Sequence, residues 1–230
     1  MRIVFVRHGE PDYVHDCLTD LGHLQAAACA QRLKEEGISR IYASPMGRAR
    51  QTAQATAQVL GMDIQILDFM HEIYWGSVDG SPLFANGHPW DLADRLVREG
   101  WDLTRTDWPE HAFYRNNLAT AEVEKISKGA DDWLMSLGYR REGTYYRCLR
   151  EKDEPFTVAL FSHGGSSTAA LSRILGLPFP YLCGFLHMPF TSLFIVRLEH
   201  RPGEISLPVL ELAGDAKHIE GLQPPRSGFN

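Results

Sequence analysis

Two segments far apart in the sequence share one form, and this repetition constrains the fold more than any other feature. In each, an apolar run ends in a polar residue that is followed by His-Gly, at residues 6–9 and again at residues 161–164. The apolar runs themselves, residues 2–6 and 157–162, predict buried central strands. If these strands are parallel neighbours, both imidazoles lie at one edge of the sheet, where open α/β folds bind their ligands.

Strand and helix patterns also alternate along the chain. After the first strand, Thr19 is placed as the N-cap of a helix that ends before Gly37. A second unit has a strand at residues 40–43, a helix that begins at Ser44-Pro45 with proline in the first helical position, and a stop at Gly61. This alternation predicts an α/β protein: a three-layer α/β/α sandwich with a mostly parallel sheet.

Shorter patterns complete the expected domain. Residues 64–67 are another strand candidate, and a helix is expected from the second His-Gly to about Leu175. Residues 192–199 and 206–212 have the pattern of a hairpin at one sheet edge. The chain of 230 residues can bury a sizeable core, so we expect a single domain over residues 1–230.

Residues 80–117 differ from the rest because they show no clean period and hold many aromatic residues. We expect a helical insertion within the domain, a cap region that covers the site at the strand ends. Its aromatic side chains could contact a ligand or could form a small core of their own, and the sequence leaves both interpretations open. These side chains are Trp90, Trp101, Trp108, Phe113 and Tyr114.

The overall charge bears on possible partners. A formal net charge of -6 gives no general attraction to nucleic acid or to an anionic membrane, so an anionic substrate must meet a local cluster of basic groups. The apolar run before Arg7 is too short for a signal peptide or a membrane span. We therefore expect a cytoplasmic protein with no nucleic-acid or membrane partner, while the oligomeric state is not determined by the sequence.

Cysteine and histidine spacing gives no sign of a metal or other cofactor. The four cysteines lie far apart, which predicts free thiols rather than a disulfide scaffold or a zinc site. The other histidines lack the spacing of a metal-binding motif, and so we expect no metal. They include His15, His23, His88, His111 and His218.

The residues around the two His-Gly pairs are suited to phosphoryl transfer. Glycine after each histidine lets the backbone approach a bound anion, and the guanidinium groups of Arg7 and Arg48 match phosphate oxygens. With His163, these arginines could stabilise the transferring group without a metal, and the neutral imidazole of His8 is a competent nucleophile.

The leaving oxygen needs a proton, which a buried carboxylic acid could supply. Glu72 follows the strand at residues 64–67 and is the best-placed candidate; Asp79 and Glu10 are the alternatives. Arg50 lies on the same helix as Arg48 but on another face, so we expect it to be solvated.

These motifs, taken in order, resemble the histidine phosphatase superfamily, also called the phosphoglycerate mutase-like family. The resemblance covers most of the chain outside the insertion. It implies that His8 accepts the phosphoryl group, that Arg7, Arg48 and His163 form the phosphate pocket with help from the Gly164 backbone, and that Glu72 is the proton donor. The matching segments are residues 7–10, 18–26, 44–53, 71–76 and 162–165.

Some positions depart from the family pattern. The family often has a hydroxyl residue and then asparagine after the opening motif, where this chain has Pro11 and Val14. The pattern therefore gives no support for phosphate contacts from these two positions. Asp12 and Tyr13 could reshape the mouth of the site, and a turn around Pro11 explains them equally well. Gly164 replaces the aspartate of the acid phosphatase and phytase branch, which favours the mutase-like branch.

Three functions remain in competition. The first is a phosphatase acting on a small phosphomonoester, the second a mutase that returns the phosphoryl group to its substrate, and the third a non-catalytic phosphate-binding module. Family mutases that use a bisphosphate primer carry paired arginines in the insertion, whereas this segment has only scattered ones, so hydrolysis is favoured. They are Arg95, Arg98, Arg105 and Arg115.

Overall fold

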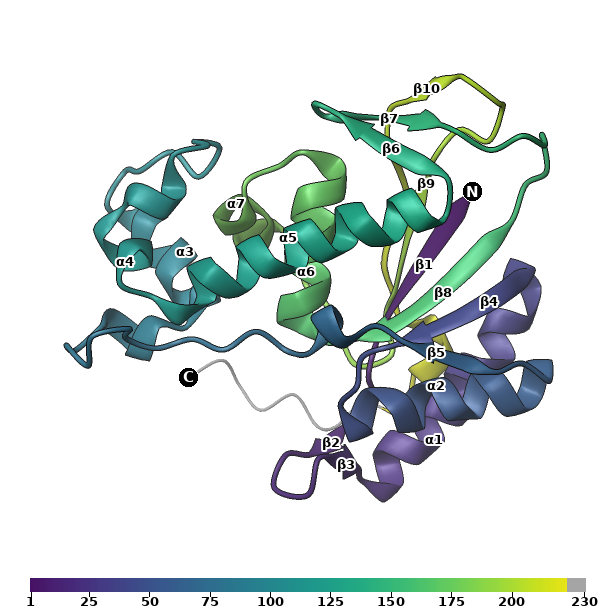
Figure 1. Ribbon diagram of the computed structural model, residues 1–230. Coiled ribbons are helices and arrows are strands. Elements are labelled where there is room, and N and C mark those ends of the chain that lie inside the picture. Colours follow the sequence, from purple (N-terminus) through teal and green to yellow (C-terminus); the bar gives the residue numbers. More distant parts are fainter. Residues whose placement is uncertain (223–230) are drawn as a thin grey trace.

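The computed structural model describes residues 1–222 and has a six-stranded sheet at its centre, in the order β11-β9-β1-β8-β4-β5 (Figure 1). Strands β1, β8, β4 and β5 are parallel, and β9 and β11 are antiparallel at one edge. This confirms the mostly parallel α/β sheet and the late antiparallel pair. The strands are β1 (Arg2–Arg7), β4 (Ile38–Ala43), β5 (Ile64–Ile66), β8 (Thr157–Ser162), β9 (Leu193–Arg197) and β11 (Val209–Asp215).

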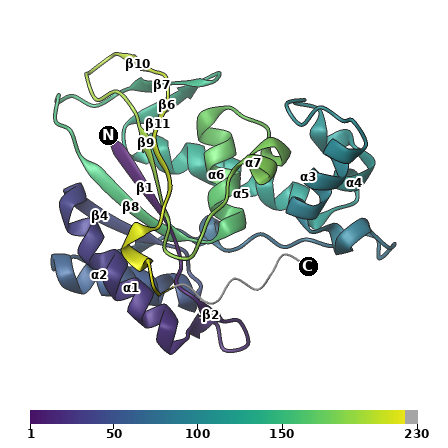
Figure 2. The ribbon, with the colours of Figure 1, turned by 180° about the vertical axis from the view of Figure 1, so that it is seen from behind.

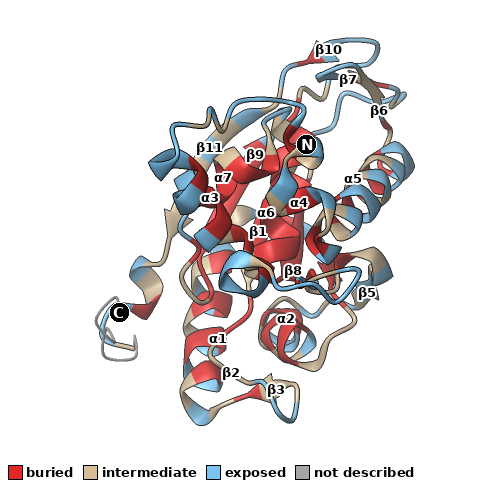
Figure 3. Cartoon of the chain, turned by 90° about the vertical axis from the view of Figure 1, so that its left-hand side faces the viewer, coloured by how far each residue is buried: buried red, intermediate tan, exposed pale blue. Residues whose placement is uncertain are grey.

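Alternating side chains along β1 build a core on each face of the sheet. Ile3 and Phe5 belong to one cluster of buried residues, whereas Val4 and Val6 belong to the other. Helices α1 (Asp20–Leu33) and α2 (Gly47–Leu60) cover the second face, and α5 (Leu118–Ser136) and α6 (Gly164–Leu175) cover the first (Figures 1 and 2). Figure 3 shows the central strands and α6 as the most continuously buried part of the chain. The three-layer arrangement is as predicted.

The register of β1 and β8 places the two His-Gly pairs side by side. Arg7 is paired with Ser162 at the end of the ladder, and the backbone N–H of His8 donates to the Ser162 carbonyl oxygen at 2.9 Å. Each histidine is therefore the first residue beyond its strand, at the same edge of the sheet.

The segment from residue 80 to 117 is largely helical, with α3 (Pro89–Arg98), α4 (Ala112–Arg115) and short 3-10 turns at Phe84–Gly87 and Trp108–Glu110. It lies at one end of the molecule, where α3 packs beside α7 (Phe179–Phe185) (Figure 1). Trp108 and Tyr114 are buried, with ring centroids 5.0 Å apart, in the same core cluster as β1. These aromatic side chains are core residues, which supports the packing interpretation for this pair.

One predicted helix start is wrong. Helix α2 begins at Gly47 with Met46 as its N-cap, not at Ser44-Pro45. The Ser44 hydroxyl instead accepts a hydrogen bond from the Met46 backbone N–H at 3.2 Å and contacts His163. The predicted cap at Thr19 is confirmed, because its hydroxyl accepts from the Gly22 N–H at 3.0 Å.

Several elements were not predicted. Strands β6 (Tyr139–Glu142), β7 (Tyr145–Cys148) and β10 (Ile205–Ser206) form a separate small sheet, and β2 (Pro11–Asp12) pairs with β3 (Cys17–Leu18) in a hairpin after the first His-Gly. No helix within residues 1–222 is long and apolar enough to cross a membrane. The remaining 3-10 turns are Lys34–Glu36, Asp68–Met70 and Lys217–Ile219.

Candidate active site

His8 lies at the floor of the site with only 1 % of its surface exposed. Its Nδ1 is 2.7 Å from the carbonyl oxygen of Gly9. Because a carbonyl can only accept, Nδ1 carries the proton, and the lone pair of the neutral ring is on Nε2. Burial, reinforced by the nearby charges of Arg7 and Arg48, lowers the pKa of His8 to about 3. The imidazole is therefore neutral at physiological pH.

His163 lies beside His8, with ring centroids 5.2 Å apart. Its Nε2 is 2.7 Å from the Ser44 hydroxyl, and its buried Nδ1 has no hydrogen-bond partner among the described residues. Burial and, after it, the positive charge of neighbouring groups lower the pKa of His163. An unpaired, buried ring nitrogen costs free energy unless a ligand satisfies it.

Arg7 and Arg48 bring two guanidinium groups to the two histidines. The Arg7 side chain stacks on the Phe190 ring at 4.5 Å and donates to the Met188 carbonyl oxygen. Arg48 Nη1 donates to Asp16 Oδ1 at 2.6 Å. The Nε atoms of both arginines are buried and have no partner within residues 1–222. Buried, unpaired cationic donors require an anion, and guanidinium geometry favours phosphate.

Glu72 lies at the start of α6. Its Oε1 accepts from the backbone N–H groups of Ile73 at 3.0 Å and Ser166 at 2.9 Å, and its Oε2 from Gly165 at 3.3 Å. Burial raises the pKa of Glu72 despite these three donors, which act in the opposite direction. A carboxyl whose proton is retained at higher pH is suited to general acid chemistry.

The two glycines after His163 have different environments. A Cβ on Gly165 would lie 2.6 Å from Glu72 Oε1. Any side chain at position 165 would therefore collide with the Glu72 carboxyl, and glycine is required there. A Cβ on Gly164 would have no contact closer than 3.9 Å, to Arg7. Gly164 therefore faces open space beside Arg7, and as the first residue of α6 its N–H has no acceptor within the helix.

A cleft of about 270 Å³ opens over these groups and brings together Arg7, Glu72 and Gly164 from the predicted set. His8, Arg48 and His163 lie beneath, each less than 5 % exposed. The structure thus brings all six predicted residues to one place. The other lining residues are Tyr13, Trp75, His88, Trp90, Gly165, Leu186, His187 and Met188.

The alternative acids are not suitably placed. Neither Glu10 nor Asp79 lines the cleft. Glu10 accepts from the Thr19 hydroxyl at 3.0 Å. Asp79 accepts hydrogen bonds from Ser81, Asn116 and Ser77, which lower its pKa and keep it ionised.

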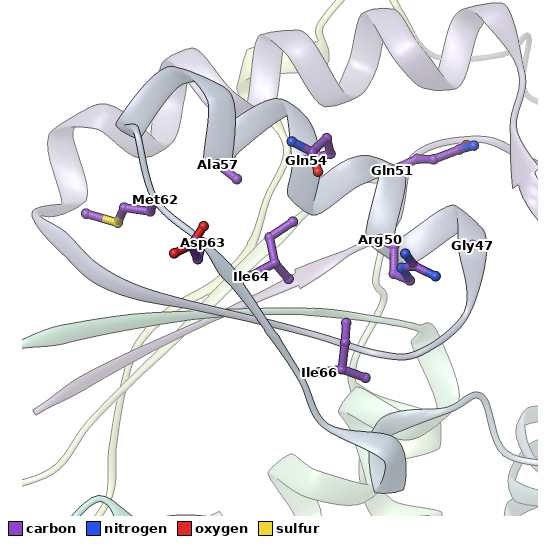
Figure 4. Close-up of a pocket in the computed structure, with 9 residues that line it drawn as sticks. All are labelled: Gly47, Arg50, Gln51, Gln54, Ala57, Met62, Asp63, Ile64 and Ile66. Atoms are coloured by element: carbon purple, nitrogen blue, oxygen red, sulfur yellow. The ribbon is translucent and has the colours of Figure 1, made fainter.

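Arg50 is exposed, as predicted, and lines a different cavity of about 570 Å³ between α2 and β5 (Figure 4). That cavity includes none of the predicted site residues, and its other ionisable side chain is Asp63. We find no arrangement of nucleophile and acid there. Within residues 1–222, no group of three or more His, Cys, Asp and Glu side chains is placed to hold a metal ion.

Sequence reasoning missed three residues that contact the predicted set: Asp16, Ser44 and Phe190. Asp16 and Phe190 carry no local pattern that points to Arg48 or Arg7, since each reaches its partner through a distant loop. The Ser44-Pro45 pair did belong to a recognised motif, but its role as a helix cap was the wrong interpretation.

The chain is similar to several known proteins. A probable phosphoglycerate mutase, GpmB, from Yersinia enterocolitica is 28% identical, covering 96% of this chain and 95% of the relative. The structure of phosphoserine phosphatase from Entamoeba histolytica in complex with 3-phosphoglyceric acid has a TM-score of 0.61 at 20% identity, over 95% of this chain and 99% of that one. Mycobacterial glucosyl-3-phosphoglycerate phosphatase has a TM-score of 0.62 at 21% identity, over 93% and 98%. At these identities the solved structures show a shared fold.

The family assignment comes from the sequence itself. The model of the histidine phosphatase superfamily (branch 1) matches residues 3–209, a range that includes both His-Gly pairs, Arg48 and Glu72. Since this range is most of the chain, the resemblance inferred from the motifs is confirmed, and the chain belongs to the histidine phosphatase superfamily.

Proposed function

We propose that this chain is a phosphatase that hydrolyses a small phosphomonoester through a covalent phosphohistidine on His8. The observation that carries the proposal is the hydrogen bond between His8 Nδ1 and the Gly9 carbonyl oxygen, because it leaves the Nε2 lone pair available in a ring that stays neutral. Superfamily membership supports the same chemistry.

In the first half-reaction, His8 Nε2 attacks phosphorus, an N–P bond forms and the P–O bond to the leaving group breaks. Glu72 gives its proton to the leaving oxygen, which departs as an alcohol. Arg7, Arg48 and the Nδ1 side of His163 stabilise the charge on the equatorial oxygens, together with the Gly164 N–H.

In the second half-reaction, water attacks phosphorus from the side that the alcohol has left. The water gives a proton to the Glu72 carboxylate, the N–P bond breaks, and the electron pair returns to His8 Nε2. Inorganic phosphate leaves, and the neutral imidazole and the protonated acid are restored for the next turnover. No metal is needed to balance either step.

The size of the cleft favours a small substrate. Its volume of about 270 Å³ is just below the roughly 300–1,000 Å³ that is typical of sites for drug-sized ligands. We also propose that residues 80–117 act as a cap within a single domain, because His88 and Trp90 from this segment line the cleft.

Mutase activity is the second candidate, because curated relatives are named probable phosphoglycerate mutases. A mutase must hold a second anionic group of its substrate. The four arginines of the insertion do not line the cleft, and each is bonded to an acid or a carbonyl nearby in the chain. Hydrolysis is therefore favoured. A phosphate-binding module is least favoured, since it would not need a free nucleophile together with an acid whose pKa is raised.

The test combines product release with trapping of the intermediate. Phosphate release from p-nitrophenyl phosphate is measured in chelator, with His8→Ala as control, and rapidly quenched enzyme is analysed for phosphohistidine at residue 8. We expect chelator-resistant turnover and a phosphohistidine that His8→Ala lacks. Conversion of 3-phosphoglycerate to its 2-isomer without phosphate release would instead establish the mutase. Near-normal turnover by His8→Ala would remove the proposal.

A further inference from the structure

Five of the side chains that line the cleft are aromatic or apolar: Tyr13, Trp75, Trp90, Leu186 and Met188. Resting on the proposed function, we propose that the substrate's leaving group is a flat, uncharged ring, aromatic or heteroaromatic, with no second anionic group. The proposal names the chemical class of the ester that this site hydrolyses.

One wall of the cleft is an aromatic ladder, which consists of Trp75, His88 and Trp90. The His88 ring lies between the indoles, with centroids 5.2 Å from Trp75 and 5.4 Å from Trp90. His88 Nδ1 is 2.7 Å from Asp91 Oδ2, which fixes the orientation of the ring. Trp75 is 37% exposed, so part of its indole surface is open to a ligand in the cleft.

The mouth of the cleft holds a fourth ring. Tyr13 is 65% exposed and lies under the Arg48 guanidinium, whose central carbon is 5.4 Å from the ring centroid. The same ring stands edge-on to His8, at 6.5 Å between centroids. With Leu186 and Met188 also in the lining, a planar leaving group on the phosphoryl oxygen would meet apolar or aromatic surface on several sides.

Charge in the cleft argues against a second anion. Among residues 1–222, Arg7 is the only arginine or lysine that lines the cleft, where the other basic side chains are His88 and His187. The His88 ring is itself bonded to Asp91, a carboxylate outside the lining, so it is not free to pair with an anion of the substrate. A carboxylate or second phosphate on the leaving group would lose its hydration without gaining a cationic partner, which is costly. A neutral ring loses little and gains the hydrophobic and stacking contribution.

The test compares two non-hydrolysable ligands that differ mainly in the group at issue. Binding of 2-phenylethylphosphonate and of 3-phosphonopropionate to the wild-type protein is measured by calorimetry, with inorganic phosphate as the reference. We expect the phenyl ligand to bind at least about tenfold more tightly than the carboxylate ligand, a difference within the range of aromatic contacts.

Variants connect this preference to the ladder. Trp75→Ala and Trp90→Ala are expected to weaken phenylethylphosphonate about tenfold and to leave inorganic phosphate within twofold. Phe84→Ala is the matched control, because Phe84 is a 49% exposed aromatic residue of the same insertion outside the cleft lining. It should change neither affinity. If a tryptophan variant melts below the assay temperature, the wild-type comparison of the two phosphonates decides alone.

The outcomes separate this inference from the proposed hydrolysis. Equal or tighter binding of the carboxylate ligand, absence of phenyl ligand binding, or an unchanged preference in both folded tryptophan variants would overturn the ring specificity. A preserved phenyl preference with no turnover of phenyl phosphate would support the ring specificity and remove the hydrolase proposal. Turnover of phenyl phosphate with preferred binding of the carboxylate ligand would support the hydrolase proposal and overturn the ring specificity.

Discussion

Asp16 and Arg48 form an ion pair at the edge of the site, with 2.6 Å between Asp16 Oδ1 and Arg48 Nη1. The other carboxylate oxygen of Asp16 accepts from the Gly47 backbone N–H, also at 2.6 Å. The Asp16 carboxylate thus binds both the backbone of the first turn of α2, at Gly47, and the side chain of Arg48 in the same turn. Because Nη1 is engaged, Arg48 is held in one orientation with its buried Nε still unpaired among the described residues.

The first prediction concerns this pair. Asp16→Ala should lower kcat/KM for p-nitrophenyl phosphate by about 10- to 100-fold, since a charge-assisted hydrogen bond contributes roughly 1.5–3 kcal/mol. Asp16→Asn should recover part of the loss, because its amide oxygen can still accept from Arg48. The measurement is steady-state kinetics beside the control Asp20→Asn, an exposed acid in the first turn of α1. Equal losses in both Asp16 variants would argue against orientation of Arg48 as the cause.

The second prediction concerns Ser44, whose hydroxyl accepts from Met46 N–H and contacts His163 Nε2. If the hydroxyl donates to Nε2, the proton of His163 is on Nδ1, the buried nitrogen that lacks a partner within residues 1–222. Ser44→Ala should therefore reduce kcat/KM about tenfold and weaken inhibition by inorganic phosphate.

Ser39 provides the control for Ser44, because it lies on β4, the strand that ends just before Ser44, and its hydroxyl bonds to the Thr157 carbonyl oxygen outside the site. Ser39→Ala is expected to retain kcat/KM and phosphate inhibition within twofold. If Ser44→Ala and Ser39→Ala behave alike, Ser44 has no part in orienting His163.

The main strands and the two histidines could be predicted because their signals are local. An uninterrupted apolar run such as residues 157–162 specifies a buried strand without knowledge of its neighbours, and the polar residue and glycine at its end mark where the strand stops. Parallel pairing then brings His8 and His163 together.

Contacts between distant loops gave no such signal. Ser-Pro has the local pattern of a helix cap, and only the position of His163 shows that the hydroxyl is used elsewhere. Asp16 is one acid in a short polar hairpin, where it adopts a positive φ of 49° that sequence patterns do not predict. Strands β6 and β7 were missed because they contain more charged residues than buried ones. Their buried residues, which face the core, are Tyr139, Tyr146 and Cys148.

The third prediction separates the two glycines after His163 by stability. Gly165→Ala should lower the free energy of unfolding by about 1–3 kcal/mol, because the new methyl group would overlap Glu72 and Ile73. Gly164→Ala has the space it needs at the first position of α6, so its melting temperature should be close to that of the wild type. Thermal unfolding followed by circular dichroism tests both. Similar melting temperatures for the two variants would contradict the packing of Glu72 against α6.

The fourth prediction uses the pKa shifts of His8 and Glu72, which move in opposite directions. The pKa of His8 is lowered to about 3, so the nucleophile is unprotonated over the whole range above mild acid. The pKa of Glu72 is raised by burial, so the acid keeps its proton to a higher pH than an ordinary glutamic acid does. Activity that needs a neutral imidazole and a protonated carboxyl should therefore fall as pH rises through the Glu72 pKa, and that descending limb of kcat/KM should be absent in Glu72→Gln.

Ionisation of the substrate also changes the pH dependence of kcat/KM, because a phosphomonoester loses its second proton near pH 6. The ratio of wild-type to Glu72→Gln activity at each pH cancels this contribution, since both enzymes meet the same ester. We expect the ratio to be large for phenyl phosphate at low pH and to decline as pH rises. For p-nitrophenyl phosphate, whose leaving group needs little protonation, the ratio should be much closer to one throughout. A ratio that is independent of pH for both esters would mean that Glu72 acts through charge or packing and that another group supplies the proton.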